Sequence, residues 1–130
     1  MVENFNLEII SPNKTLLKKE VELVTIPAFE GLMTILKDHI SIVTFLRPGF
    51  IDARVKNIVE KFYVEEGTVE FSKNQLLILS STAINVKNLP INDISAMIED
   101  VKKQLSKNEI KDKQRYILNY KIDALQQINK

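Results

Sequence analysis

The only histidine, His39, directly follows Asp38, and an imidazole beside a carboxylate could hold a metal ion or transfer a proton. Adjacent residues of an extended strand, however, point to opposite faces of a sheet. The chain also has no second histidine and no cysteine that could complete a metal coordination shell. A role in a turn or in a contact with a partner is therefore favoured over a metal or acid–base site.

Glu65 and Glu66 are adjacent carboxylates of the kind that acid–base catalysis uses. They precede Gly67 in a predicted hairpin turn, where solvated acids are common. The three glycines are isolated, so no glycine-rich loop that binds phosphate opens a helix. Nothing supplies a nucleophile together with a base, and we expect a non-catalytic chain without metal or cofactor.

Basic side chains near the C-terminus could contact an acidic surface of a partner. The candidates are Lys107, Lys111, Lys113, Arg115, Lys121 and Lys130. Acidic residues lie in the same stretch and lysine is frequent throughout the chain, so the stretch alone is also explained by solubility.

The composition limits the kind of partner. The chain has 130 residues, of which 45% are hydrophobic, enough for one compact core. Lys plus Arg total 18 and Asp plus Glu total 17, so no overall field would attract nucleic acid or an anionic membrane. The absence of cysteine excludes disulfides and fits a reducing compartment. No run of about 18 apolar residues occurs, and we expect membrane association only through a partner.

Residues 1–88 have the pattern of short strands separated by turns. The predicted strands are residues 5–9, 21–25, 33–36, 40–46, 50–55, 58–64, 68–71 and 76–84. We expect the second of these to end before Pro27, which has no backbone donor, and residues 76–84 to form one central strand because they begin apolar on both faces. Short strands at this spacing predict an antiparallel β-sandwich.

After Leu89 the period changes to steps of three and four residues, from Ile91 to Leu105. This pattern predicts an amphipathic helix with Asn88 as a candidate cap and Pro90 in its first turn, ending near residues 106–108. A second helix is predicted over residues 109–127, capped by Asn108. Its apolar stripe comprises Ile110, Ile117, Tyr120, Ala124 and Ile128, widened by Leu118, Ile122 and Leu125.

Two helices joined by so few residues predict an antiparallel hairpin over residues 89–130. Because isolated helices of this length are marginal in water, the hairpin must dock on an apolar surface. The expected fold class is α+β, with an N-terminal antiparallel β-sandwich followed by a C-terminal two-helix hairpin.

Several stretches occur in an order that carries more information than any one of them. They are Leu-Glu-Ile-Ile-Ser-Pro (7–12), Glu-Gly-Leu-Met-Thr-Ile-Leu-Lys-Asp-His-Ile (30–40), Leu-Arg-Pro-Gly (46–49), Phe-Tyr-Val-Glu-Glu-Gly (62–67) and Thr-Ala-Ile (82–84). Followed by two helices, this order resembles the epsilon subunit of F-type ATP synthase, the counterpart of the mitochondrial delta subunit, over nearly the whole chain.

The chain departs from the family pattern in places. Thr34 replaces a glycine, Lys37 and Asp38 replace a Pro-Gly pair, and Glu66 replaces the first residue of a Gly-Gly pair. Some bacterial members bind ATP through a hydrophobic-Asp-x-x-Arg-Ala motif. Asn92 and Ser95 stand here in place of its acid and its arginine, so the phosphate contact is lost and we expect no tight ATP binding.

The resemblance implies a rotor subunit in the central stalk of a proton-translocating ATP synthase, peripheral on the cytoplasmic side of the cell inner membrane. Its implied partners are the gamma subunit and the c-ring, with Glu30, Gly31 and His39 at or near the ring. The implied hairpin contacts the beta and alpha subunits and inhibits ATP hydrolysis, for which Lys111, Lys113, Arg115 and Lys121 are the hypothesis.

The residues alone leave another class open. A small β-sandwich adaptor or binding module that self-associates through its helical hairpin would show the same strands, the same helices and the same lack of catalytic groups. It would not bind the gamma subunit.

Overall fold

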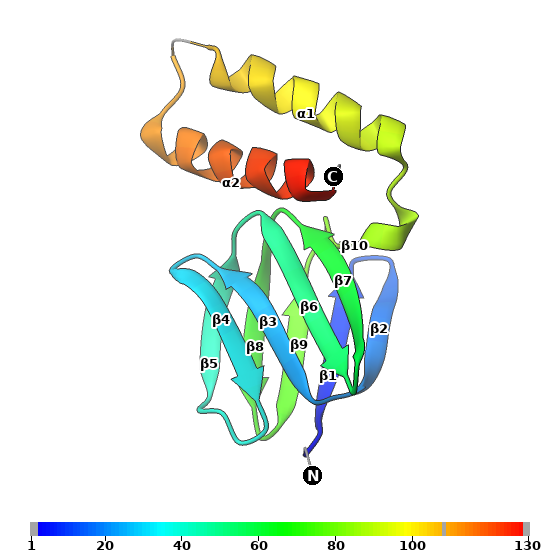
Figure 1. The fold of residues 1–130 in the computed structure, drawn as a ribbon. Helices are drawn as coiled ribbons and strands as arrows, with labels where there is room; N and C mark the ends of the chain where they lie inside the picture. Colours follow the sequence, from blue (N-terminus) through cyan, green and yellow to red (C-terminus); the bar gives the residue numbers. More distant parts are fainter. Residues whose placement is uncertain (1–2, 108, 129–130) are drawn as a thin grey trace.

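The computed structural model describes residues 3–107 and 109–128. The strands are β1 (Phe5–Ser11), β2 (Lys14–Val21), β3 (Leu23–Ala28), β4 (Gly31–Leu36), β5 (Ile42–Leu46), β6 (Gly49–Val55), β7 (Ile58–Val64), β8 (Gly67–Ser72), β9 (Gln75–Leu79) and β10 (Ile84–Asn85). A short 3-10 helix, η1 (Val86–Asn88), precedes α1 (Ile91–Leu105) and α2 (Asp112–Ile128). Figure 1 shows the strands as a sandwich with both helices across one end, which confirms the predicted fold class.

The strands follow one continuous order, β10-β7-β6-β3-β5-β8-β9-β1-β2, with β4 added to β3. β3 and β5 pair only where Ala28 meets Leu46, so the sheet folds there into two layers. One layer holds β4, β3, β6, β7 and β10, and the other holds β5, β8, β9, β1 and β2. Among these pairings only β1 with β9 is parallel.

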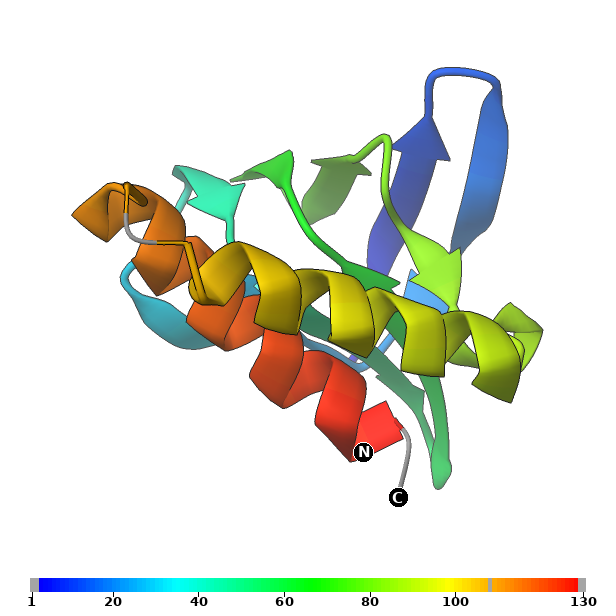
Figure 2. The same ribbon diagram turned by 90° about the horizontal axis from the view of Figure 1, so that it is seen from above.

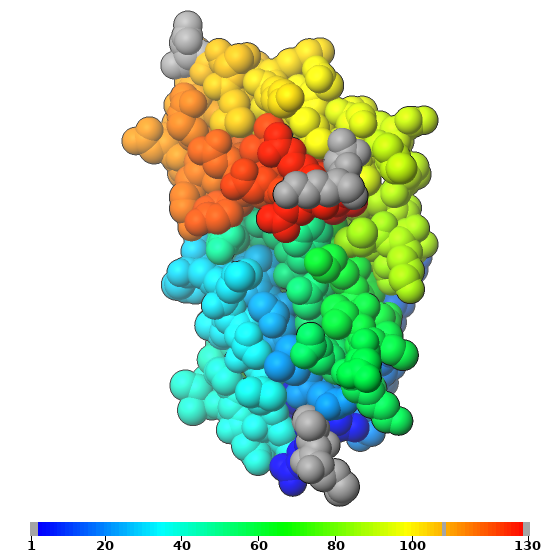
Figure 3. Space-filling view, viewed as in Figure 1, coloured from blue at the N-terminus to red at the C-terminus, as the bar shows by residue number. Residues whose placement is uncertain are grey.

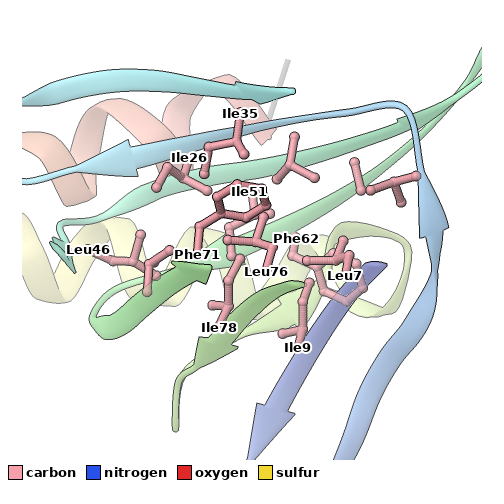
Figure 4. Close-up of a cluster of buried hydrophobic side chains, with 14 of the residues drawn as sticks. Leu7, Ile9, Ile26, Ile35, Leu46, Ile51, Phe62, Phe71, Leu76 and Ile78 are labelled. Carbon is pink, nitrogen blue, oxygen red and sulfur yellow. The ribbon is translucent and has the colours of Figure 1, made fainter. Parts of the chain in front are cut away.

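Apolar side chains from both layers meet between them. Alternate residues of β1 point inward, so that Phe5, Leu7 and Ile9 are buried. Figure 4 shows the resulting core, in which side chains of one layer such as Ile26 and Ile51 face those of the other, such as Ile78. The core residues of this cluster all lie in strands β1 to β9, so the sandwich has a core of its own.

The second strand was predicted wrongly. Residues 14–21 form β2, which the pattern did not reveal because a bulge opposite Ile9 and Ile10 disturbs its alternation. The predicted strand over residues 21–25 is divided at Glu22, and β3 continues through Pro27 to Ala28. Pro27 removes one donor, but its carbonyl still accepts the Arg47 N–H at 3.0 Å, so the strand persists.

Residues 76–84 are not one strand. The chain leaves β9 after Leu79 and crosses to β7 in the other layer, where it forms β10. The Ser80 hydroxyl stabilises the crossing, since it donates to the Glu66 carbonyl at 2.6 Å and accepts the N–H groups of Thr82 and Ala83. The polar residues Ser80, Ser81 and Thr82 interrupt the apolar run at this point, and they were the local signal that the strand ends after Leu79.

The helix ends differ from the prediction. Pro90 is the N-cap of α1, with no side-chain cap, while Asn88 ends η1. α2 begins at Asp112 rather than at residue 109, and the predicted cap Asn108 lies outside the described residues. Of the predicted apolar stripe on α2 only Ala124 is fully buried; the other buried residues are Leu118 and Leu125, from the widened face.

The helices form a second apolar cluster beside the sandwich. α2 lies between α1 and the end of the sandwich, as Figures 1 and 2 show from two directions. Ile94, Ile98 and Val101 of α1 are buried in the same cluster as Leu118 and Leu125 of α2. Outward residues of the nearest layer complete it: Phe50, Tyr63 and Ile84. The space-filling view shows the helices seated on the strands as a distinct upper body (Figure 3).

Candidate functional site

The layer that the helices do not cover exposes apolar side chains on its outer face. In β5, Thr44 and Leu46 are buried, so the intervening Val43 and Phe45 point outward and are 77% and 61% exposed. Leu77 and Leu79 of β9 lie in register with Val43 and Phe45, respectively, with one residue of β8 between the members of each pair. We call these four residues the β5–β9 face. Exposed Glu70 and Thr68 of β8 lie between the two apolar pairs, so the face is apolar along both sides with a polar strip between them. Exposed apolar side chains rimmed by polar ones are typical of a protein contact.

The second exposed apolar surface is an edge strand. β4 pairs with β3 alone in the described part of the chain, so its other edge is open. Leu32 and Leu36 point outward from it, 74% and 48% exposed. Glu30 and Gly31 stand where β4 begins, whereas His39 follows its end, so the structure separates them by the length of the strand. We call residues 30–40, which comprise the strand and its flanking residues, the β4 edge.

His39 and Asp38 do not form an acid–base pair. The Asn74 side chain accepts the Asp38 N–H at 2.7 Å and donates to the Asp38 carboxylate at 3.0 Å. His39 Nδ1 lies 2.7 Å from the Ile40 carbonyl, and its ring meets Phe71 edge-on. Both side chains shape the connection between β4 and β5, at the end of the sandwich away from the helices (Figure 1). Ile40 beside them is 76% exposed.

The Glu65 and Glu66 side chains form hydrogen bonds and an ion pair with residues of other parts of the fold. The Glu66 carboxylate accepts the N–H and hydroxyl of Ser81. One Glu65 oxygen, Oε2, accepts the Tyr63 hydroxyl at 2.9 Å and lies 3.1 Å from Lys121 Nζ on α2. Burial, together with the neighbouring Glu65 carboxylate, raises the pKa of the Tyr63 phenol far above its usual range. The phenol therefore remains protonated and donates to Glu65.

The basic candidates do not form one group, and Lys130 lies outside the described residues. Lys111, Lys113 and Arg115 are exposed at the start of α2, whereas Lys121 is half-buried and paired with Glu65. The hairpin instead brings the start of α2 to the end of α1, where further lysines are exposed. We define the basic tip as Lys102, Lys103, Lys107, Lys111, Lys113 and Arg115. The predicted antiparallel hairpin already contained the signal for Lys102 and Lys103, because it places residues 102–107 beside residues 111–115.

The start of α1 lacks a cationic side chain that could pair with phosphate. Asn92 and Ser95 are exposed, and Ile94 is the buried residue of this turn. The sequence has no lysine or arginine in residues 91–101.

Sequence reasoning missed the contacts that join α2 to the sandwich. Arg47, only 9% exposed, donates from Nε to the Ala28 carbonyl, and its Cζ lies 3.7 Å from the centroid of the Tyr120 ring. This distance is that of a cation–π contact. One turn earlier on α2, Tyr116 donates to the Phe29 carbonyl at 3.1 Å. No local sequence pattern predicts such contacts, because Arg47 and Tyr120 are 73 residues apart in the chain and Phe29 and Tyr116 are 87 residues apart.

None of the helices in the described ranges has the length and apolar character needed to cross a membrane.

Comparisons with known proteins agree on one family. The family model for the beta-sandwich domain of the ATP synthase Delta/Epsilon chain matches residues 4–86. The ATP synthase epsilon chain of Pelagibacter ubique (strain HTCC1062) is 42% identical over 130 residues, which cover 99% of this chain and 100% of that one. The epsilon chain of Chelativorans sp. (strain BNC1) is 34% identical over 106 residues, which cover 81% and 78% of the two chains.

Solved structures show a similar fold at low sequence identity. A chain in the Euglena gracilis mitochondrial ATP synthase (OSCP/F1/c-ring) superposes with a TM-score of 0.78 at 16% identity, over 95% of this chain and 80% of that one. A chain in the central stalk/c-ring structure of the Tetrahymena thermophila mitochondrial ATP synthase gives a TM-score of 0.65 at 18% identity, over 98% of both.

Proposed function

Because this chain belongs to the family of ATP synthase epsilon chains, we propose that it joins the gamma subunit to the c-ring in the central stalk of the enzyme. An epsilon chain is a non-catalytic subunit, and the family replaces the self-associating adaptor that the strands and helices alone left open. The proposed location is the cytoplasmic side of the cell inner membrane, with the ring as the attachment.

The observation that carries the proposal is the β5–β9 face, which we assign to the gamma subunit. It is apolar along both sides, it lies on the layer without helices, and it stands on a sheet with its own core. A rotor contact must transmit torque without deforming, and a closely packed sandwich resists deformation. Near α2 the face borders a cleft that Phe45 and Lys113 line together, so a partner on it would also reach the basic tip.

The β4 edge is the proposed contact with the c-ring. Glu30 and Gly31 would touch the ring at one end of the strand and His39 at the other, with Leu32 and Leu36 between them. The support is an exposed apolar edge strand, a feature that isolated proteins normally avoid or protect. β4 and β5 are consecutive in the chain but lie in different layers, so the proposed ring and gamma contacts would lie on different layers of the sandwich.

Leu36→Asp combined with Ile40→Asp is expected to lower ATP-driven proton pumping by about tenfold or more, since two buried charges would face the ring. The measurement uses stripped membranes rebuilt with the head, gamma and this chain. Binding to gamma should be unchanged. Ile91→Asp, an equally exposed apolar residue at the start of α1, is the control and should pump normally. Full pumping by the double variant would reject the β4 edge as the ring contact.

The hairpin is the proposed brake on ATP hydrolysis. The basic tip carries six positive side chains, and residues 102–115 contain only two acids, so the tip would meet an acidic surface of the beta subunit. Lys121 would join this contact only after it leaves Glu65. The altered motif at Asn92 and Ser95 supports a hairpin that responds to the state of the rotor rather than to ATP.

The test of the brake is hydrolysis by an F-type head that lacks its epsilon chain. The full chain is expected to bind and to slow hydrolysis, whereas the triple variant Lys111→Glu, Lys113→Glu, Arg115→Glu should bind equally well and restore most of the rate. The matched control reverses three exposed lysines of the sandwich: Lys14 at the start of β2, and Lys56 and Lys73 in turns. Equal inhibition by the triple variant and the native chain would remove the basic tip from the brake.

A further inference from the structure

The hairpin and the sandwich are separately packed units. The core of the sandwich draws every member from strands β1 to β9. The cluster around the helices contains one fully buried strand residue, Tyr63, and its other buried members are helical. The core of the sandwich is therefore independent of the hairpin, whereas the helix cluster loses its contacts with Phe50, Tyr63 and Ile84 if the hairpin moves away. Local opening of such a unit costs less free energy than global unfolding.

Polar contacts from one side of α2 join these units in addition to the apolar contacts with Phe50, Tyr63 and Ile84. Lys121 pairs with Glu65, and both side chains are largely withdrawn from water, with 20% and 25% of their surfaces exposed. Tyr120 beside it covers the Arg47 guanidinium. Both contacts reach the residues that end a strand: Arg47 follows β5, and Glu65 follows β7.

We infer that the Lys121–Glu65 ion pair and the Tyr120–Arg47 stack form a latch that keeps the hairpin docked on the sandwich. Glu65 is suited to this role because the same carboxylate oxygen binds Lys121 and the buried Tyr63 hydroxyl. Tyr63 fixes the carboxylate in place, so Lys121 meets an acceptor that is already oriented. Loss of α2 would leave Glu65 with Tyr63 alone and would uncover Arg47.

The latch has a consequence that rests on the proposed function. Lys121 is one of the residues proposed to meet the beta subunit, and it cannot serve Glu65 and a second carboxylate surface together. Docking and inhibition would therefore compete for the same ammonium group.

Amide hydrogen exchange of the isolated full chain tests the latch without any other subunit, so its outcome is independent of the hydrolysis assay. Glu65→Gln or Lys121→Gln is expected to speed exchange in α2 about three- to tenfold, while strands β1 and β6 exchange as before. The charge swap Glu65→Lys with Lys121→Glu should recover at least half of the protection. Lys87→Gln, at an exposed lysine of η1 outside the latch and the basic tip, is the control and should change nothing.

The second contact is tested by Tyr120→Leu, which keeps an apolar side chain over Arg47 but removes the aromatic ring. We expect exchange in α2 to rise about threefold. Unchanged exchange in both the Glu65 and the Tyr120 variants would overturn the latch. Faster exchange shared equally by the strands would also overturn it, because the contacts would then hold the whole fold rather than the hairpin.

Discussion

Phe45→Glu is expected to weaken binding of the chain to the gamma subunit by at least about a hundredfold, the loss typical of a central aromatic anchor in an interface. Phe45 is 61% exposed in the free chain, so its replacement costs the fold little. In the complex, the proposed contact would bury the new carboxylate against an apolar surface without a partner, which adds to the loss. Titration of gamma with the native and variant chains measures the effect.

Ile58→Glu is the matched control for that experiment. Ile58 is 68% exposed and starts β7, in the other layer of the sandwich. Its replacement should leave gamma binding within about twofold, and both variants should unfold within about 0.5 kcal/mol of the native chain. Similar losses in the two variants would point to nonspecific charge effects, and native binding by Phe45→Glu would move the gamma contact off the β5–β9 face.

Gly67→Ala is expected to lower the free energy of unfolding by about 3 to 5 kcal/mol, a large part of the stability of an ordinary domain. Gly67 has φ +157, and a Cβ there would lie 2.6 Å from the Leu79 carbonyl oxygen and 3.1 Å from Leu46 Cδ1. The neighbour at 2.6 Å is backbone of β9, which cannot move without breaking its pairing with β8. Urea unfolding measures the loss.

Gly31→Ala separates the two causes of that loss. Gly31 has φ +141, but a methyl group on its Cα would meet no atom within 4 Å, so its substitution carries backbone strain alone, about 1 to 3 kcal/mol. The Gly67 variant should be less stable than the Gly31 variant by about 2 kcal/mol, the cost of overpacking. Equal losses would mean that β9 shifts to accept the methyl group.

The sequence was sufficient for the fold class, because strand alternation and helical spacing are local properties. It was not sufficient for the layer crossing after Leu79, where the deciding hydrogen bonds come from Ser80 to a turn 14 residues earlier. The β5–β9 face was also hidden, since residues 42–46 are apolar on both sides and the pattern cannot say which side is covered.

In the candidate site, too, features that depend on local pattern could be predicted, and features that depend on long-range contacts could not. The connection that contains His39 was predicted as a turn from its polar residues, and the structure has it between β4 and β5. The position of Lys121 beside Glu65 depends on how α2 lies on the sandwich. The residue spacing within α2 or within β7 does not predict that arrangement. The basic tip required only the hairpin, so the local pattern could have assigned it.

The parallel pairing of β1 with β9 determines when the sandwich can be completed during synthesis. β1 ends at Ser11, and its partner begins at Gln75. At roughly 5 to 20 residues per second, the ribosome needs about 3 to 13 s to supply the missing strand. During that interval one edge of the N-terminal hairpin has no neighbour. A chain with such distant pairing is expected to fold slowly and to depend on chaperones before it meets the rotor.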